Sequence, residues 1–172
     1  FSGAIEKIEG TPENGEIVDV CLGKNFLGRG FYNPGQSIAV RFLTFQDEPI
    51  TPEFWQKKLK TALAFRRETV AKTSNAYRLV HGEGDFLPGL TIDNYNGHLV
   101  LQASTAGIEK QKPVLIPILQ ELLQPKSIYE KNDIPSRKVE KLAVHSTQLL
   151  GTTPDLVEIN ENGLKFLVDI KN

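Results

Sequence analysis

The chain has 172 residues, 40% of them hydrophobic, which is enough apolar surface for the core of one large or two small domains. A formal net charge of −1 excludes a global field that would recruit nucleic acid or membrane. The single cysteine excludes an internal disulfide and a cysteine-rich zinc site.

No apolar run approaches the roughly 18–20 residues that span a bilayer, and the sequence contains no recognisable secretory leader. We therefore expect a cytoplasmic protein without a membrane partner. The sequence holds no methionine and begins at Phe1, so we also expect it to be a piece of a longer chain.

Residues 1–45 have the pattern of short strands. Alternating segments at 17–22 and 26–32 flank a turn at 23–25, and a third strand is expected over 37–44. Strands this short, separated by Gly and Pro turns, predict a small barrel. Cys21 is expected to be a small buried hydrophobe rather than a reactive thiol. The basic and aromatic side chains here fit a nucleic-acid surface and ordinary strand decoration equally well: Lys24, Arg29, Tyr32 and Arg41.

Residues 51–71 carry the clearest helix signal, with Thr51 as a candidate N-cap and Pro52 at the first helical position. One face of this helix is apolar: Trp55, Leu59, Ala62, Leu63 and Val70. The opposite face is basic: Lys57, Lys60 and Arg67. This local excess of positive charge indicates an anionic partner or, as readily, a solvated helix face.

Arg66 projects into the middle of the apolar face of this helix. A buried guanidinium without a partner is destabilising by several kcal/mol, so Arg66 needs a carboxylate or a carbonyl. We interpret it as a structural ion pair in preference to a ligand contact.

Residues 76–95 predict a hairpin whose two alternating strands flank an acidic, glycine-rich turn. In the first strand Tyr77, Leu79 and His81 are expected to share one face. His81 is interpreted as a structural histidine rather than an acid–base group. Arg78, Glu83 and Asp85 are expected to form structural ion pairs, with the two carboxylates facing Arg66 or Arg78.

The remaining elements follow from turns and periodicity. A strand over 98–104 follows the Asn96-Gly97 turn, and an amphipathic helix is expected over 113–123, with Pro117 confining or kinking it. A short strand at 127–130 precedes a polar loop with a short helix at 132–142. Two last strands, 156–160 and 164–170, are expected to pair across residues 161–163.

The sequence contains no pattern for catalysis. Gly28-x-Gly30 and Gly82-x-Gly84 lack the third glycine and the following helix of a dinucleotide loop. The three histidines are far apart in the sequence, without metal-ligand spacing. We therefore predict no catalytic residue, no cofactor-binding residue and no metal ligand among these 172 residues.

Two strings resemble the bacterial large-subunit ribosomal RNA cytosine-5 methyltransferase I family: FLGRGFYNPGQSIAVRFLT at 26–44 and NAYRLVHGEGDFLPGLTIDNY at 75–95. The resemblance implies a PUA barrel, a central strand-rich domain and a Rossmann-type domain that binds S-adenosylmethionine. The last of these would lie beyond Asn172. Phe86 and Lys141 stand where the family has glycine, and Asn94 where it has arginine.

The resemblance implies an α+β fold class, with an incomplete PUA-like β-barrel followed by a central α+β domain of strand-strand-helix-strand type. The expected domains are a PUA-like barrel over 1–48, a connecting helix over 49–72, the central domain over 73–150 and a hairpin over 151–172. That hairpin would lead into the methyltransferase domain.

The resemblance also implies that this segment binds and positions ribosomal RNA, and that the whole protein transfers a methyl group from S-adenosylmethionine to C5 of a cytosine. The segment alone is expected to be inactive and to bind no cofactor. The RNA contacts expected from charge and exposure are Lys24, Arg29, Tyr32, Arg41, Lys57, Lys60 and Arg67. A stand-alone RNA-binding module and a structural segment that forms a homodimer remain as alternatives.

Overall fold

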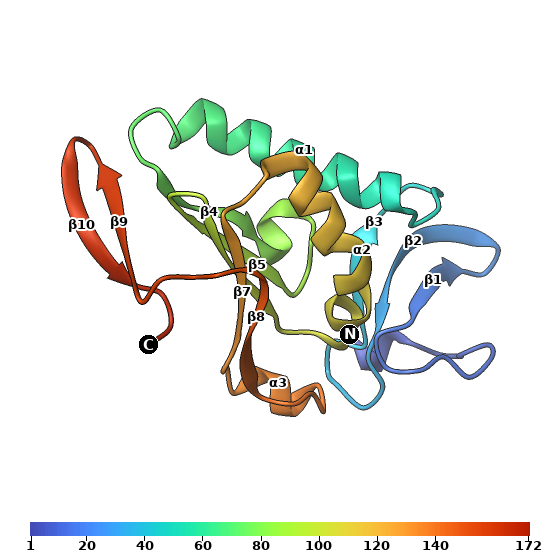
Figure 1. The fold of residues 1–172 in the computed structure, drawn as a ribbon. Helices are drawn as coiled ribbons and strands as arrows, with labels where there is room; N and C mark the ends of the chain where they lie inside the picture. The colour runs from blue at the N-terminus through green and yellow to red at the C-terminus, as the bar shows by residue number, and fades with distance from the viewer.

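The computed structural model describes all residues from 1 to 172 and has the α+β fold class that was expected (Figure 1). After a short 3₁₀ turn, η1 (Ser2–Ala4), an antiparallel sheet forms from β1 (Ile17–Leu22), β2 (Asn25–Tyr32) and β3 (Val40–Thr44). Gly30 lets β3 approach closely, because a Cβ at this position would lie 2.2 Å from the Arg41 carbonyl oxygen. No helix of the structure is both long and apolar enough to cross a membrane.

Two expectations for this N-terminal sheet are wrong. The third strand begins at Val40 rather than at residue 37, because the Asn33 amide donates to the Ala39 carbonyl and closes a turn that leaves Ile38 exposed. Cys21 is exposed rather than buried. The register of β1 against β2 shifts between Val20 and Cys21, beside the turn at the end of an edge strand, where no element covers the thiol.

The helix α1 (Pro52–Thr69) forms where the sequence predicts it and joins the two halves of the molecule. Its apolar face buries Trp55, Leu59, Ala62 and Leu63. Trp55 stacks on Phe31 of β2 with ring centroids 6.1 Å apart, which ties the N-terminal sheet to the start of the helix.

The second half is built on a five-stranded sheet. Its strands lie in chain order: β4 (Ala76–His81), β5 (Leu90–Tyr95), β6 (His98–Ala103), β7 (Ser127–Asn132) and β8 (His145–Gly151). Only β6 and β7 are parallel, and the crossover between them is the helix α2 (Ala106–Leu123). Helices α1 and α2 pack on one face of the sheet, where the main hydrophobic core lies (Figure 1).

The helix α2 is longer than expected, because it begins at Ala106 and continues through Pro113 and Pro117. Each proline lacks an amide donor and disfavours a helix interior by about 3 kcal/mol. Both lie on the exposed side, while Ile108, Leu115 and Leu119 are buried in the core. Ile118 is buried as well, and four large apolar side chains contribute roughly 6–12 kcal/mol against about 6 kcal/mol lost at two prolines, so we attribute the continuous helix to this burial.

Strand β8 was not predicted, because its sequence HSTQLLG opens with four polar residues and lacks clear alternation. It is an edge strand, and Ser146, Thr147 and Gln148 are exposed. The short helix α3 (Ser136–Val139) lies within the segment where one was expected.

The first strand of the central hairpin also departs from the predicted alternation. The register of β4 against β5 shifts between Arg78 and Val80, and Leu79 and Val80 are both buried. This bulge removes the single face that Tyr77, Leu79 and His81 were expected to share.

The last hairpin, β9 (Leu156–Glu161) and β10 (Leu164–Asp169), pairs as expected and packs on the face of the five-stranded sheet away from the helices. Val157, Ile159 and the following Ile170 contact Val100 there and form a second, smaller core. The outer part of the hairpin extends beyond the sheet (Figure 1).

A bidentate ion pair fixes α1 to the acidic turn after β4. The Arg66 guanidinium donates to both Asp85 carboxylate oxygens, at 2.9 and 2.6 Å, and its Nε donates to the Arg78 carbonyl at 3.0 Å. Asp85 also accepts the backbone amide of His81 at 2.6 Å. The turn itself is the 3₁₀ segment η2 (Gly82–Asp85). Asp85 therefore stabilises the turn and the helix contact at once.

The other expected ion pairs have a different arrangement. Arg78 pairs with Asp93, its partner across β4 and β5, at 2.8 Å, rather than with the acidic turn. Glu83 is exposed and forms no ion pair.

Replacing Arg66 with Ala should lower the free energy of unfolding by about 3 kcal/mol, because it leaves the nearly buried Asp85 carboxylate without its partner. Urea unfolding followed by circular dichroism measures this change. Arg67→Ala is the matched control, since Arg67 is exposed and unpaired, and it should change stability by less than about 0.5 kcal/mol. Unchanged stability of the Arg66 variant together with lost RNA binding would contradict the structural role.

Candidate nucleic-acid interface

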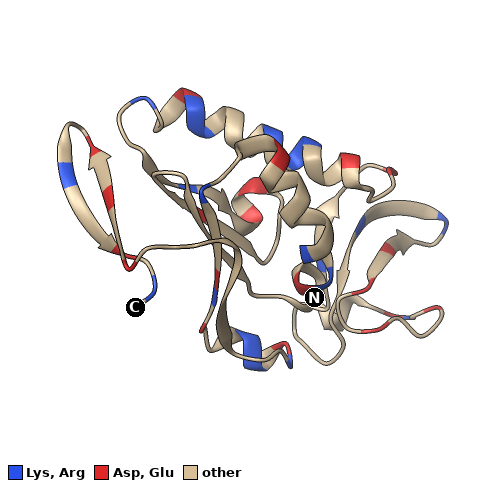
Figure 2. Ribbon diagram, in the orientation of Figure 1, with Lys and Arg blue, Asp and Glu red and all other residues tan.

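The outward face of α1 presents three cations that no carboxylate neutralises. Lys57, Lys60 and Arg67 are exposed, and none of them forms an ion pair. Lys60 donates only to the amide oxygen of Gln56, one turn away, at 3.1 Å. Figure 2 shows positive residues along the length of this helix. Free ammonium and guanidinium groups spaced along a rigid helix can follow a phosphate backbone.

Two exposed aromatic rings on or next to α1 lie beside Arg66 and Lys58, and they were not predicted as part of a site. Phe65 on α1 is 59% exposed and Phe86, after the acidic turn, is 56% exposed. The Arg66 guanidinium lies 5.0 Å from the centre of the Phe65 ring. Exposed aromatic rings next to cations are a stacking surface for unpaired bases. The signals in the sequence are Phe65, which lies off the apolar stripe, and Phe86, a large side chain in a turn.

Lys58 of α1 lies between the exposed Phe86 ring and the buried Phe54 ring. Its ammonium lies 5.0 Å from the centre of the Phe86 ring and 5.3 Å from that of Phe54. Burial lowers the pKa of Lys58, and the nearby Glu48 carboxylate opposes that effect. Lys58 therefore holds Phe86 in place, and Lys57 and Lys60 remain free to contact a ligand.

Phe86 also has an unusual backbone conformation. Its φ of 55° is in the left-handed region, which a bulky side chain rarely adopts. The conformation closes η2, because the Phe86 amide donates to the carbonyl of Glu83. The turn thereby directs a large aromatic side chain outward, where glycine would present none.

Most of the predicted cations of the N-terminal sheet already form ion pairs with carboxylates. Arg29 pairs with Asp19 at 2.5 Å and with Asp47 at 3.3 Å, and it also donates to the Glu48 carbonyl. Arg41 pairs with Glu140 at 3.1 Å. To contact a phosphate, either arginine would have to exchange a partner that it already has.

Two further predicted contacts lie on the same sheet. Lys24 is exposed in the turn between β1 and β2 and forms no ion pair, and Tyr32 at the end of β2 is half-buried. Lys24 is thus the one basic residue predicted on this sheet that is free to bind an anion.

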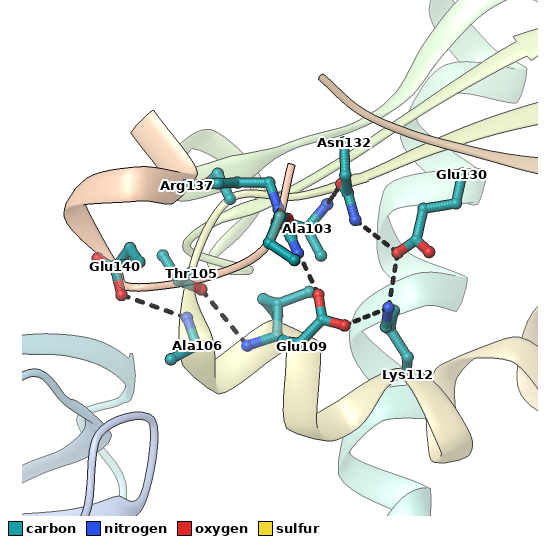
Figure 3. Close-up of polar contacts among 12 residues, drawn as sticks. Ala103, Thr105, Ala106, Glu109, Lys112, Glu130, Asn132, Arg137 and Glu140 are labelled. Atoms are coloured by element: carbon teal, nitrogen blue, oxygen red, sulfur yellow. Dashed lines mark hydrogen bonds and ion pairs between the residues drawn. The ribbon is translucent and has the colours of Figure 1, made fainter. Parts of the chain in front are cut away.

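A cluster of buried charges lies between α2, β6, β7 and α3 (Figure 3). Arg137 of α3 is 1% exposed, and it donates to the Ala103 carbonyl, to Glu109 at 2.9 Å and to the Ala143 carbonyl at 2.7 Å. Lys112 bridges Glu109 to Glu130 of β7, which lies 2.7 Å from its ammonium.

Glu130 and Glu140 complete this cluster. Glu130 is 1% exposed and also contacts Asn132 at 2.6 Å and His145 at 3.0 Å. Glu140 accepts the amide of Ala106 at 3.2 Å, at the start of α2, and pairs with Arg41 of the N-terminal sheet. The cluster therefore joins both sheets.

Buried charges with shifted pKa values often mark active sites. Burial raises the pKa of Glu109, but the hydrogen bonds from Lys112 and Arg137 outweigh it and hold that pKa below its usual value. Burial lowers the pKa of Lys112, and its bonds to Glu109 and Glu130 outweigh this and raise it. Every charge of the cluster is satisfied by a neighbour, and none lines the cavity on the five-stranded sheet or the groove beside the turn after α1. We interpret the cluster as structural.

No group of three or more His, Cys, Asp and Glu side chains is placed to hold a metal ion.

A cavity of about 250 Å³ lies on the open face of the five-stranded sheet and is lined by Asp93, Asp169 and Lys131 among others. Two carboxylates against one ammonium make it a poor place for a phosphate.

Comparison with known proteins gives a family match to the N-terminal part of the chain and similar proteins that align with nearly all of it. The profile of a family described as a PUA-like domain matches residues 1–45. The ribosomal RNA large subunit methyltransferase I of Tolumonas auensis is 46% identical over 177 aligned residues, which cover 99% of this chain and 44% of the relative. The protein of the same name from Escherichia coli is 40% identical, with 100% and 44% covered. The chain thus spans less than half the length of these relatives.

Two solved structures share the fold. A protein from Streptococcus mutans assigned as a SAM-dependent methyltransferase has a TM-score of 0.75 at 20% identity, over 95% of this chain and 42% of that one. A second structure, of a protein assigned as a methyltransferase in complex with SAH, has a TM-score of 0.76 at 20% identity, over 94% and 41%.

Replacing Glu109 with Gln should lower the free energy of unfolding at neutral pH by about 2 kcal/mol, because the nearly inaccessible Arg137 loses its carboxylate. The pKa of Glu109 is lower in the folded state, so its stabilisation is present above pH 4.5, its ordinary value, and is lost as the pH falls through the folded-state pKa. The variant should therefore lose less stability than the wild type on acidification. Urea unfolding at several pH values measures both effects.

Glu83→Gln is the matched control, since Glu83 is exposed and forms no ion pair. Its stability should follow the wild type at every pH. Equal stability of the Glu109 variant and this control at neutral pH would contradict the structural role of the cluster.

Proposed function

We propose that this chain is the RNA-binding and RNA-positioning part of a longer S-adenosylmethionine-dependent methyltransferase that modifies C5 of a cytosine in ribosomal RNA. The observation that carries the proposal is the 46% identity to a ribosomal RNA large subunit methyltransferase I across 99% of the chain. The matched PUA-like profile at residues 1–45 supports an RNA-binding role for the N-terminal sheet.

S-adenosylmethionine does not fit the residues present here. A dinucleotide-type site needs a glycine-rich turn that opens a helix with free backbone amides. The N-terminus of α2 is closed instead, because its Ala106 amide donates to Glu140 and a Cβ on Gly107 would lie 2.1 Å from the Phe31 ring. In this proposal the cofactor and the catalytic residues belong to a part of the protein outside residues 1–172, and this chain alone is inactive.

In this proposal each expected domain has its own role. Residues 1–48 and 73–150 form the PUA-like and central domains, α1 within 49–72 connects them, and the hairpin within 151–172 leads to the methyltransferase domain. The protein acts on RNA in the cytoplasm without a membrane or a metal ion.

The outward face of α1 makes the first phosphate contacts in this proposal. Lys57, Lys60 and Arg67 have no carboxylate to release, so binding a phosphate breaks no existing ion pair. Lys24 is equally free, whereas Arg29 and Arg41 contact RNA only by exchanging their carboxylate partners. Phe65 and Phe86 supply the stacking surface beside α1, and Tyr32 supplies a second one on the N-terminal sheet.

A second candidate function is a structural segment that binds protein, including another copy of this chain. The exposed apolar side chains of β10 favour it: Leu164, Phe166 and Leu167. Sedimentation of the chain over a range of concentrations decides whether it self-associates. A stand-alone RNA-binding module is the third candidate, and it differs from the proposal only in lacking a catalytic partner.

Replacing Lys57, Lys60 and Arg67 together with Gln should weaken binding to single-stranded ribosomal RNA and flatten its salt dependence. Each phosphate contact to a single strand contributes about −0.7 to the slope of log affinity against log salt concentration. Loss of three contacts should therefore make this slope less negative by about 2. Fluorescence anisotropy across a salt series measures the slope. Gln keeps the helix propensity of the exposed positions.

The matched control replaces Lys138, Lys141 and Lys165 with Gln, which makes the same charge change at exposed positions away from α1. Its slope should stay within experimental error of the wild type. Equal slopes for the two triple variants would exclude α1 as the phosphate-binding surface, and a wild-type slope near zero would exclude RNA binding through phosphates altogether.

Methylation of unmodified ribosomal RNA by the full-length protein tests the enzymatic part of the proposal. The full-length protein should transfer a methyl group to C5 of a cytosine, and this chain alone should transfer none. Methyl transfer by the chain alone would contradict the placement of the catalytic residues outside it.

A further inference from the structure

A polar groove of about 460 Å³ lies where four separate segments meet. Its walls come from the turn after α1, the start of β4, the Asn96-Gly97 turn between β5 and β6, and β9. Figure 1 shows the chain after α1 beside the β9–β10 hairpin. The volume falls within the roughly 300–1,000 Å³ typical of small-ligand pockets. The groove is thus large enough for one small polar ligand.

Amide side chains dominate the lining of this groove, and only Ala71 and Tyr77 are hydrophobic. Four asparagines line it: Asn75, Asn94, Asn96 and Asn160. A pocket for an apolar ligand or a cofactor is mostly hydrophobic. This lining suits a flat ligand with several hydrogen-bonding groups on its edge.

The asparagines are held by their own hydrogen bonds. Asn75 Oδ1 accepts the Asn160 amide at 2.7 Å, and Asn160 Oδ1 accepts the Gly163 amide at 3.1 Å. Asn94 donates to the Asn75 carbonyl at 2.9 Å and accepts the Gly97 amide at 3.1 Å. The side chains are therefore fixed before any ligand binds.

Several donors and acceptors are left without a partner within the chain. The Nδ2 groups of Asn75 and Asn160 and the hydroxyl of Tyr77 donate to no protein atom, and Asn96 Oδ1 accepts from none. A free amide NH₂ group or amide oxygen of this kind can form a hydrogen bond with the edge of a base. Unpaired bases in RNA are recognised through such edge contacts.

We propose that this groove binds one unpaired nucleobase of the RNA. The inference rests on the proposed function and deepens it, because it adds a base-reading subsite to a surface that otherwise contacts phosphates and stacks bases.

The position of α1 favours a base over a phosphate in the groove. The helix ends at Thr69, and its C-terminal end carries partial negative charge that repels an anion. Positive groups lie at the rim instead. Lys72 is exposed and pairs with Glu68 at 2.8 Å, and the aliphatic part of the Lys126 side chain lies over Gly97. A strand that follows α1 past Arg67 can keep its phosphates at this rim and insert a base between the asparagines.

Asn75→Asp and Asn160→Asp test the groove without disturbing its frame. Each replacement keeps the oxygen that accepts a backbone amide and exchanges only the free NH₂ group for an oxygen. Asn25→Asp, at an exposed position at the start of β2, makes the same change of charge elsewhere. Each groove variant should bind single-stranded RNA up to roughly tenfold more weakly than the Asn25 variant, the loss expected for one base-edge hydrogen bond.

Nuclear magnetic resonance gives a second readout that does not depend on RNA. Titrating the wild-type chain with adenosine, cytidine, guanosine and uridine should shift the side-chain amide signals of Asn75 and Asn160. Ribose 5-phosphate, which has no base, should leave them unchanged.

The outcomes separate the two proposals. Nucleoside-induced shifts without any RNA binding would support the groove and contradict the proposed function. Normal RNA binding with groove variants equal to the Asn25 control, or amide signals that no nucleoside moves, would overturn the groove. Equal shifts with ribose 5-phosphate would also overturn it, because the groove would then bind phosphate.

Discussion

The buried guanidinium of Arg137 is the interaction on which the arrangement of the two sheets depends. It holds β6 through the Ala103 carbonyl, α2 through Glu109 and the segment before β8 through the Ala143 carbonyl. Three residues further on, Glu140 reaches Arg41 of the N-terminal sheet. Breaking one partner of such a cluster leaves other charges buried and unpaired, so its members stabilise one arrangement of the elements they join.

The fixed arrangement of the two sheets also determines the position of α1. The helix packs against both sheets, through Trp55 on Phe31 at one end and Arg66 on Asp85 at the other. Because both ends are fixed, the helix that carries the outward cations keeps a constant position relative to both sheets. The turn after α1 then leads directly into the asparagine groove. In our proposal, phosphate contacts, stacking and base reading follow one another along a single rigid element.

The sequence was sufficient to predict the local elements and the need of Arg66 for a partner, because helical periodicity and turn residues are local signals. It did not predict β8, whose polar edge-strand sequence resembles a loop, or the start of α2, where burial outweighs two prolines. The charge cluster was missed for a related reason. Arg137 lies in a polar segment that suggests a solvated loop, and only its contacts with distant residues bury it. The asparagine groove likewise combines residues from 71 to 160 that no sequence spacing connects.

The central claim is that RNA follows α1 and enters the asparagine groove. Ultraviolet cross-linking of the chain to single-stranded ribosomal RNA, followed by mass spectrometry of the linked peptides, tests it most directly. The account predicts cross-links at Phe65 and Phe86 beside α1 and at Tyr77 in the groove. Cross-links confined to the N-terminal sheet, around Lys24 and Tyr32, would contradict it.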